Sequence, residues 1–482
     1  MDWHLDDQHL RPLALAECNY FLQVFYTEWV DLVISVVNKV FCILRVGRIG
    51  LAEKKRSFIL WIGIAFNLVT LVGMKYGNFY IAGLTRLLAR MGFQTAQGGL
   101  AFLVPVGLSF IAVQMISYLV DIYNRKLEPE ISWLDFATFV IYFPKLISGP
   151  VERPRGLLPA LKQPKELNAA SAERYAWLIV IGLIRKLVLA DTIASMIPLT
   201  LFTQPASHPA LDLIIGLLGY AFVIYNDFAG YSSIVRGVSG FFGIELTNNF
   251  KLPYFSRNFS EFWGRWHVSL SSWLRDYIFF PSSRALLKRN PNREAALYLA
   301  LPPLLTMLVS GMWHGIGWNY LVWGGLYGIY LLSERLIGLH SPKNLPDEWP
   351  KWRQFLSIVG VFVLVVLAWI PFRMDLRTAW QYVTHVLTPS AWIKPSFWLM
   401  RMSILGRVKI NNWAELNLPD PRILVMLIPA LLLDWAQFRN NEEWIFIYWP
   451  VWAKALFVVL LVIVLILLSL ASTGAPFVYQ GF

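Results

Sequence analysis

The sequence predicts an all-helical protein that crosses a membrane many times, and three observations carry this prediction. Of its 482 residues, 57% are hydrophobic and only 15% are charged, whereas charged residues make up about 25% of an ordinary soluble domain. Uncharged runs long enough to cross a hydrocarbon layer of about 30 Å recur along the chain. The basic residues gather in short clusters between these runs. We therefore expect roughly ten transmembrane spans, with re-entrant and amphipathic helices among them.

The clearest expected spans are uncharged, strongly apolar stretches, which lie at residues 57–74, 101–120, 295–313, 355–371 and 455–472. Weaker candidates carry polar residues or interruptions and lie near residues 21–46, 133–149, 175–197, 213–235 and 423–433. The first of these contains Glu28 and Asp31, which oppose membrane insertion. We divide the chain into a polar tail, residues 1–19, and one membrane domain, residues 20–482.

The formal net charge of +12 could indicate a nucleic-acid partner or the retention of basic loops in the cytoplasm. Basic residues cluster at 45–56, 153–165 and 284–293, each between apolar runs. This placement favours cytoplasmic loops over RNA binding. The two cysteines, Cys18 and Cys42, form neither a disulfide framework nor a CxxC metal motif.

The richest functional stretch is residues 258–281, where aromatic, basic and hydroxyl residues surround His267. Placed on one helix, its large apolar side chains form one arc, and its charged ones fall opposite. The arc comprises Phe259, Phe262, Trp263, Trp266, Leu270, Trp273, Leu274 and Tyr277; Glu261, Arg265, Ser272 and Asp276 lie across from it. His267 stands at the margin of the arc beside Ser260 and Ser271. We expect such a helix to follow the membrane boundary or to line a cavity.

A second histidine lies in a run, residues 295–333, that contains no charged residue. At 1.5 Å per residue, one helix of this length would measure about 58 Å, nearly twice the hydrocarbon thickness. The run must therefore break, and Gly311, Gly315 and Gly317 mark the place. They flank Trp313 and His314. A histidine at such a junction, where small residues allow close approach, is a candidate site.

Several other polar residues interrupt apolar sequence. Asn226 and Asp227 do so from within a candidate span, where Asp227 needs a partner or a water-filled cavity; structural and functional roles both stay open. For Arg185 and Lys186 we favour snorkelling to a membrane surface over binding an anionic donor.

Two further expectations concern the connecting segments. Residues 139–164 contain five prolines and cannot form one straight helix. His208, His340 and His385 lie near loops and are interpreted as surface histidines.

The two histidines in motifs are the bases best suited to chemistry in the membrane part. Burial disfavours the imidazolium, so His267 and His314 would be neutral and able to accept a proton from a hydroxyl nucleophile. No nucleophile elbow, P-loop or HExxH motif occurs in the sequence. Group transfer by a positioned base is therefore favoured over serine or metal hydrolysis. A proton-coupled transporter would also place histidines and a buried aspartate in the membrane.

The motifs add a family resemblance to this interpretation. The chain resembles the membrane-bound O-acyltransferase family, and its bacterial alginate O-acetyltransferase branch, in FWGRWHVSLSSWLRDYIFFP and SGMWHGIGWNYLVWGGLYG. Further stretches look like the same branch: PVGLSFIAVQMISYLVDIY, YFPKLISGPVERP, GLIRKLVLAD, YNDFAGYSS and PFVYQGF. The likeness extends from about residue 57 to the carboxyl end and is best over residues 101–335. Two departures are the weakly apolar first span and FFPSSRALLKRNPNR, where relatives commonly have a glycine-rich turn.

The resemblance implies a helical membrane fold with a funnel or channel, in which His314 is the essential catalytic base and His267 the second active-site residue. The residues carried over in supporting or donor-binding roles are Asp227, Asn226, Trp266, Ser271, Arg275, Asp276, Trp313 and Asn319. An acyl donor, usually acetyl coenzyme A, approaches from the cytoplasm. The transfer requires neither a metal nor a bound cofactor.

The resemblance also implies the setting of the reaction: the bacterial cytoplasmic (inner) membrane, with an exported polysaccharide as acceptor. Because such a polymer lies outside the membrane, we expect an extracytoplasmic SGNH-type acetyltransferase as partner, and no nucleic acid. The acceptor itself stays open. One alternative is transfer of D-alanine from a carrier protein to teichoic acid; a distant one is the proton-coupled transporter.

Overall fold

A computed structural model describes residues 53–92, 107–291, 295–315, 317–340, 349–393, 422–440 and 443–471. Every regular element in these ranges is a helix, which confirms the predicted fold class. The chain divides into two compact units, residues 1–166 and 167–482. Each unit is described by itself. The division into a polar tail and one membrane domain stays a prediction, because residues 1–52 lie outside the described ranges.

The first unit is built around two packed helices, α2 (Glu53–Arg90) and α3 (Leu108–Tyr123). Arg56 Nη2 donates a hydrogen bond to the Tyr123 carbonyl oxygen at 2.8 Å and so ties their ends together. Three short helices follow: α4 (Trp133–Ile141), α5 (Phe143–Leu146) and α6 (Pro154–Lys162). The proline-rich segment is therefore not one straight helix, as predicted.

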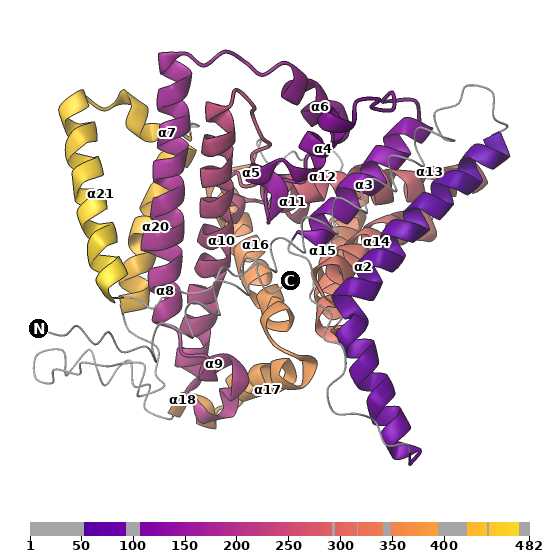
Figure 1. The fold of residues 1–482 in the computed structure, drawn as a ribbon. Coiled ribbons are helices and arrows are strands. Elements are labelled where there is room, and N and C mark those ends of the chain that lie inside the picture. The colour runs from indigo at the N-terminus through magenta and orange to yellow at the C-terminus, as the bar shows by residue number, and fades with distance from the viewer. Residues whose placement is uncertain are drawn as a thin grey trace, which may run out of the picture. The chain divides into compact units, whose positions relative to one another are not determined.

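The second unit begins with a helical succession that packs along one long helix (Figure 1). Its members are α7 (Ala169–Leu183), the π-helical segment η2 (Ile184–Ala190), α8 (Asp191–Ser195) and the long helix α10 (Ala210–Phe241). Glycines bring the backbones into contact: a Cβ on Gly230 would lie 2.7 Å from the Lys186 nitrogen, and one on Gly182 equally close to the Gly230 carbonyl oxygen. Small residues permit this close approach between membrane helices.

A helical hairpin of α14 (Ala296–His314) and α15 (Trp318–His340) follows the predicted break. Gly315 ends α14 in an extended conformation, where a Cβ would overlap the Tyr320 ring. Gly311 and Gly324 let the two helices touch, because a Cβ on either would overlap a carbonyl oxygen of the other helix. The helix α14 therefore presents His314 at its carboxyl end.

The rest of the second unit consists of further helices and short helical turns. Its longer helices are α13 (Phe280–Arg289), α16 (Lys351–Arg373), α17 (Leu376–Leu387), α20 (Arg422–Asn440) and α21 (Val451–Ala471). Short connecting turns are α9 (Thr200–Thr203), η3 (Pro205–Ser207), η4 (Pro253–Phe255), α18 (Ser390–Ile393) and η8 (Ile445–Tyr448).

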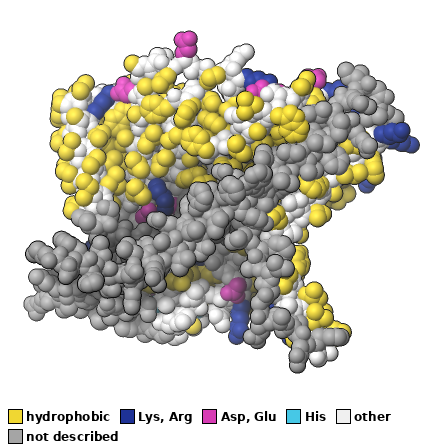
Figure 2. All heavy atoms as spheres, viewed as in Figure 1, with side chains coloured by type: hydrophobic (Ala, Val, Ile, Leu, Met, Phe, Trp, Pro, Cys, Tyr) yellow, Lys and Arg dark blue, Asp and Glu magenta, His cyan; other side chains and the backbone are white. Residues whose placement is uncertain are grey.

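Five helices in the described ranges are long and apolar enough to cross a membrane: Glu53–Gly77 of α2, α10, α14, α16 and Val451–Leu468 of α21. They confirm four of the clearest expected spans. The weaker candidate at 213–235 lies within α10 and is also long and apolar enough to cross a membrane. The stretch 101–120 is described only from residue 107, and 21–46 lies outside the described residues, so the count of roughly ten stays a prediction. Figure 2 shows mostly hydrophobic side chains over α7 and α21, as lipid-facing helices require.

The α14–α15 contact supplies a matched pair of neighbouring glycines. Gly324→Ala is expected to lower the free energy of unfolding by about 1–3 kcal/mol, because the added Cβ would overlap the Met307 carbonyl oxygen. Gly325→Ala should instead raise it by up to about 1 kcal/mol, because alanine favours a helix and no described atom lies within 4 Å of the new Cβ. Thermal unfolding in detergent measures both changes. Equal effects would contradict the close contact.

Candidate functional site

The motif around His267 is not one continuous helix. It forms α11 (Phe259–Arg265) and α12 (Val268–Leu274), and between them His267 adopts a left-handed backbone conformation with φ 42° and ψ 51°. The expectation of one amphipathic helix is wrong at this point, because a left-handed residue ends the helical hydrogen-bond pattern. The apolar arc still faces inward: Phe262, Trp266 and Leu270 are buried.

A neighbouring segment holds this break in place. The Val268 N–H donates to the Asn249 carbonyl oxygen at 3.0 Å, and the Ser269 N–H donates to Asn249 Oδ1 at 3.1 Å. On the other side of the turn, the Lys251 N–H donates to the Arg265 carbonyl oxygen at 2.9 Å. Sequence reasoning missed Asn249. Asparagine commonly caps helices. Because Asn249 is not adjacent to the first turn of α12 in the sequence, no local pattern marks it as the cap.

His267 lies in an aromatic enclosure and is 1% exposed. Its ring centroid is 4.8 Å from that of Phe228 on α10 and 6.1 Å from that of Trp313 on α14, both edge-on. The residue stands outside the candidate spans. Burial lowers its pKa from 6.5 to about 3, so the imidazole is neutral near pH 7, as the sequence predicts for a base.

His314 ends α14 and is 4% exposed. Its ring centroid lies 4.9 Å from that of Trp313, 5.1 Å from that of Trp323 and 5.3 Å from that of Phe372. Trp313 therefore contacts both motif histidines. The structure brings His267 and His314 onto the same tryptophan from two segments that are distant in the sequence.

Buried hydrogen-bond donors accompany His314. Ser310 Oγ, one helical turn before it, makes no hydrogen bond to any residue that the structure describes, and the same holds for Trp323 Nε1 and the Tyr327 hydroxyl. The Trp323 and Tyr327 rings are 5.2 Å apart. Buried donors are normally satisfied by protein, water or ligand. This array suits the oxygen atoms of a bound substrate or of ordered water.

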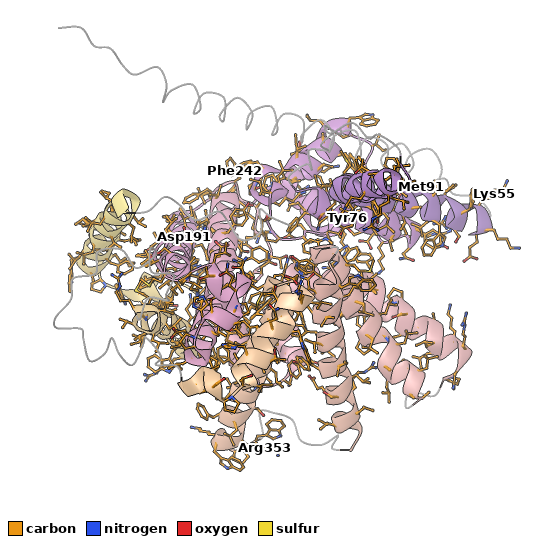
Figure 3. The ribbon with its side chains drawn as sticks, turned by 90° about the horizontal axis from the view of Figure 1, so that it is seen from below. Lys55, Tyr76, Met91, Asp191, Phe242 and Arg353 are labelled. Carbon is orange, nitrogen blue, oxygen red and sulfur yellow. The ribbon has the colours of Figure 1, made fainter. Side chains whose placement is uncertain are left out.

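Asn226 and Asp227 are held by the two basic residues of η2. Lys186 Nζ lies 2.7 Å from Asp227 Oδ1 and also 2.7 Å from Asp191 Oδ1. Asp191 is labelled in Figure 3. Arg185 Nη1 donates to Asn226 Oδ1 at 2.8 Å. The snorkelling expected for Arg185 and Lys186 is wrong: the π-helical turn directs both neighbours toward α10, where polar partners replace water.

Arg185 also joins η2 and α10 to the distant helix α20. Its Nη2 donates to Asp434 Oδ1 at 2.5 Å and to Gln437 Oε1 at 2.8 Å, and the Tyr225 hydroxyl donates to Asp434 at 3.2 Å. Asn226 and Asp227 directly precede Phe228, whose ring contacts His267. We therefore interpret both as residues that position the wall of the site.

Of the remaining expected site residues, Trp266, Ser271 and Asn319 are held by hydrogen bonds within the second unit, and Arg275 and Asp276 lie on the segment that follows α12. Trp266 is 2% exposed and stacks in the core, its carbonyl oxygen accepting a hydrogen bond from Ser271 Oγ at 2.9 Å. Asn319 Nδ2 donates to the Pro371 carbonyl oxygen at 3.1 Å, tying α15 to α16. Arg275 is exposed and Asp276 half-buried on the π-helical segment η5 (Arg275–Phe279), so Arg275 does not share the buried environment of the histidines.

The surface interpretation of the other histidines is partly wrong. His208 is only 5% exposed, because His385 Nε2 lies 2.9 Å from its carbonyl oxygen and α17 covers it. The side chain of His340 lies outside the described residues.

A cavity of about 440 Å³ lies beside the buried aromatic residue Trp266. Tyr225 and Phe250 line it and also contact Trp266, with ring centroids 6.3 and 5.1 Å away. Arg185, Lys251 and Arg265 give the lining a basic character. His267 is not among the residues that line this cavity.

The buried His267 makes stability depend on pH. The folded pKa of about 3 lies below the unfolded value of 6.5, so between these values the unfolded chain binds more protons and stability falls as pH falls. His267→Asn, which tolerates the left-handed turn, is expected to remove about 2 kcal/mol of the loss between pH 6.5 and 5. Unfolding measured at both pH values tests this; identical pH slopes for variant and wild type would contradict it.

Comparison with known proteins shows which family the chain is similar to. Residues 124–374 match the profile of MBOAT, the membrane-bound O-acyltransferase family. The chain is 31% identical over 396 residues to the "Probable alginate O-acetylase AlgI" of Pseudomonas aeruginosa, covering 81% of this chain and 72% of the relative. The "Peptidoglycan O-acetyltransferase" of Helicobacter pylori is 30% identical, covering 75% and 70%. The "Teichoic acid D-alanyltransferase" of Streptococcus thermophilus is 30% identical, covering 59% and 72%.

Proposed function

Because the chain belongs to the membrane-bound O-acyltransferase family and is an O-acyltransferase, we propose that it transfers acetyl groups. The donor is a cytoplasmic thioester, acetyl coenzyme A, and the acetyl groups move toward hydroxyls of an exported polysaccharide. The relatives named as acetylases support an acetyl group and a glycan acceptor. The relative named as a D-alanyltransferase matches a smaller share of this chain, 59% against 81%. This difference favours acetylation over D-alanylation.

The observation that carries the proposal is the meeting of His267 and His314 on the ring of Trp313. In the transfer, His314 accepts the proton of the acceptor hydroxyl, and the hydroxyl oxygen attacks the thioester carbonyl carbon. The new carbon–oxygen bond forms as the carbon–sulfur bond breaks, and the thiolate leaves. A neutral imidazole is suited to this role. A thioester needs no metal to react with a well-oriented oxygen nucleophile.

The aromatic and polar groups around His314 support its assignment as the base. Trp323 and Phe372 exclude bulk water from the imidazole, with ring centroids 5.1 and 5.3 Å away. The buried donors Ser310 Oγ and the Tyr327 hydroxyl would bind substrate oxygens near it. An enclosed site protects the thioester from hydrolysis while the acceptor is positioned.

We expect the acetyl group to reach the polymer through an extracytoplasmic SGNH-type acetyltransferase, with this chain in the bacterial cytoplasmic membrane. The argument is that the donor lies in the cytoplasm and the exported polymer beyond the membrane. Complete acetylation of the polymer by the purified chain alone would overturn the need for this partner.

The donor can be tested directly in membranes that contain the chain. Labelled acetyl coenzyme A is expected to pass its label to polymer or partner, whereas a D-alanyl carrier protein should not serve as donor. Label transfer from the carrier alone would replace acetylation by D-alanylation. Transfer from neither donor would contradict the proposed donor class.

A further inference from the structure

Asn249 is the residue that most directly fixes the His267 turn, and it is 0% exposed. Its backbone carbonyl oxygen accepts the Val268 N–H, and its side-chain Oδ1 accepts the Ser269 N–H. The remaining polar group of the side chain, Nδ2, makes no hydrogen bond to any part of the chain that the structure describes. A buried amide N–H without an acceptor is costly, and native proteins rarely keep one without a use.

This amide lies at the turn that carries His267. Nδ2 shares its carbon with Oδ1, and Oδ1 faces the first turn of α12, directly after His267. His267 itself holds a positive φ of 42°, a strained conformation for a non-glycine residue. The strained backbone of His267 and the Asn249 Nδ2 donor therefore occur at the same turn.

We propose that Asn249 is a further active-site residue, whose Nδ2–H binds the carbonyl oxygen of the acyl thioester beside His267. This inference rests on the proposed acetyl transfer. When the acceptor oxygen attacks the carbonyl carbon, the carbonyl oxygen gains negative charge, and the amide hydrogen bond stabilises it. The charge returns as the carbon–sulfur bond breaks and the thiolate leaves with the electron pair. The proton of the acceptor hydroxyl goes to His314, so Asn249 neither gains nor loses a proton.

Asn258 offers a matched control. It caps α11 as Asn249 clamps α12, because its Oδ1 accepts the Glu261 N–H at 2.7 Å. Asparagine and aspartate are equally good acceptors in such a position. Asn→Asp therefore preserves the acceptor at both sites and removes the amide donor. Asn249 is buried and Asn258 half-buried, so N249D is expected to cost more stability. If Asn249 only clamps its helix, both variants should still keep the wild-type kcat per folded molecule.

The test measures labelled acetyl transfer per folded molecule in wild type, N249D and N258D. We expect N249D to lose about 10²-fold in kcat, the effect of removing one oxyanion donor, and N258D to stay near wild type. The activity of N249D relative to wild type should rise as pH falls, because a protonated carboxyl group can again donate. A kcat for N249D equal to that of N258D would overturn the proposal.

Two further comparisons keep the result decisive. If the buried charge prevents N249D from folding, Asn249→Ala takes its place, and an unchanged kcat per folded molecule would overturn the proposal. Wild-type activity separates the two inferences: if the wild type fails to transfer acetyl, the proposed function fails. If it transfers acetyl and the Asn249 variants do so equally well, only the role of Asn249 fails.

Discussion

His314→Ala is expected to lower acetyl transfer by about 10²- to 10⁴-fold, the usual contribution of a positioned general base. The imidazole ends α14 against Trp313, Trp323 and Phe372, and its removal leaves the second motif histidine, His267, at a centroid distance of 6.1 Å from the Trp313 ring. Transfer of labelled acetyl from acetyl coenzyme A, measured in membranes with equal amounts of each protein, gives the ratio.

The matched control for this variant is His385→Ala. His385 lies on α17 and contacts the His208 carbonyl oxygen, away from the aromatic wall around His314, so its loss should leave turnover near the wild-type value. Equal transfer by wild type and His314→Ala would remove His314 from the mechanism. Equal losses in both histidine variants would show a general effect of lost packing.

Arg185→Leu is expected to lower the free energy of unfolding by about 3–5 kcal/mol, the cost of leaving a buried ionic partner uncompensated. Asp434 is only 2% exposed, and the Arg185 guanidinium is its ionic partner at 2.5 Å. The loss also frees Asn226 from its contact with Arg185. Denaturation in detergent, followed by tryptophan fluorescence, measures the change.

Two controls separate a buried ion pair from an ordinary one. Arg185→Leu combined with Asp434→Leu should recover most of the lost stability, because neither charge is then buried alone. Lys454→Leu removes an ion pair with Glu173 at 2.6 Å, where Glu173 is 43% exposed, and should cost less than about 1 kcal/mol. A double variant as unstable as the single one would contradict the pairing.

Several features followed from the chain alone because they depend on local sequence. The uncharged run after residue 295 is too long for one span, and Gly315 ends α14 at His314 as expected. The prolines between residues 139 and 164 divide that segment into short helices. Both motif histidines were found from their neighbours, and the structure places them on one tryptophan.

Other features could not be read in this way because they depend on contacts between distant segments. A helical pattern runs unbroken through His267 in the sequence. In the structure, Asn249 accepts hydrogen bonds from the Val268 and Ser269 N–H groups, and the Lys251 N–H donates to the Arg265 carbonyl oxygen, which holds the left-handed turn. Arg185 resembles a residue at a membrane surface, but its partner Asp434 lies 249 residues further along the chain. No local pattern reports such a partner.

The sequence by itself thus determined the helical membrane class and the break before α15, and it singled out the two motif histidines as candidate site residues. These depend on hydrophobicity, chain length and glycine content, which act over one helix or less. Only the tertiary structure decided the conformation of His267, the burial of Arg185 and the place of Asn249. The physical reason is that a buried polar group must find its partner wherever the fold brings one, regardless of separation along the chain.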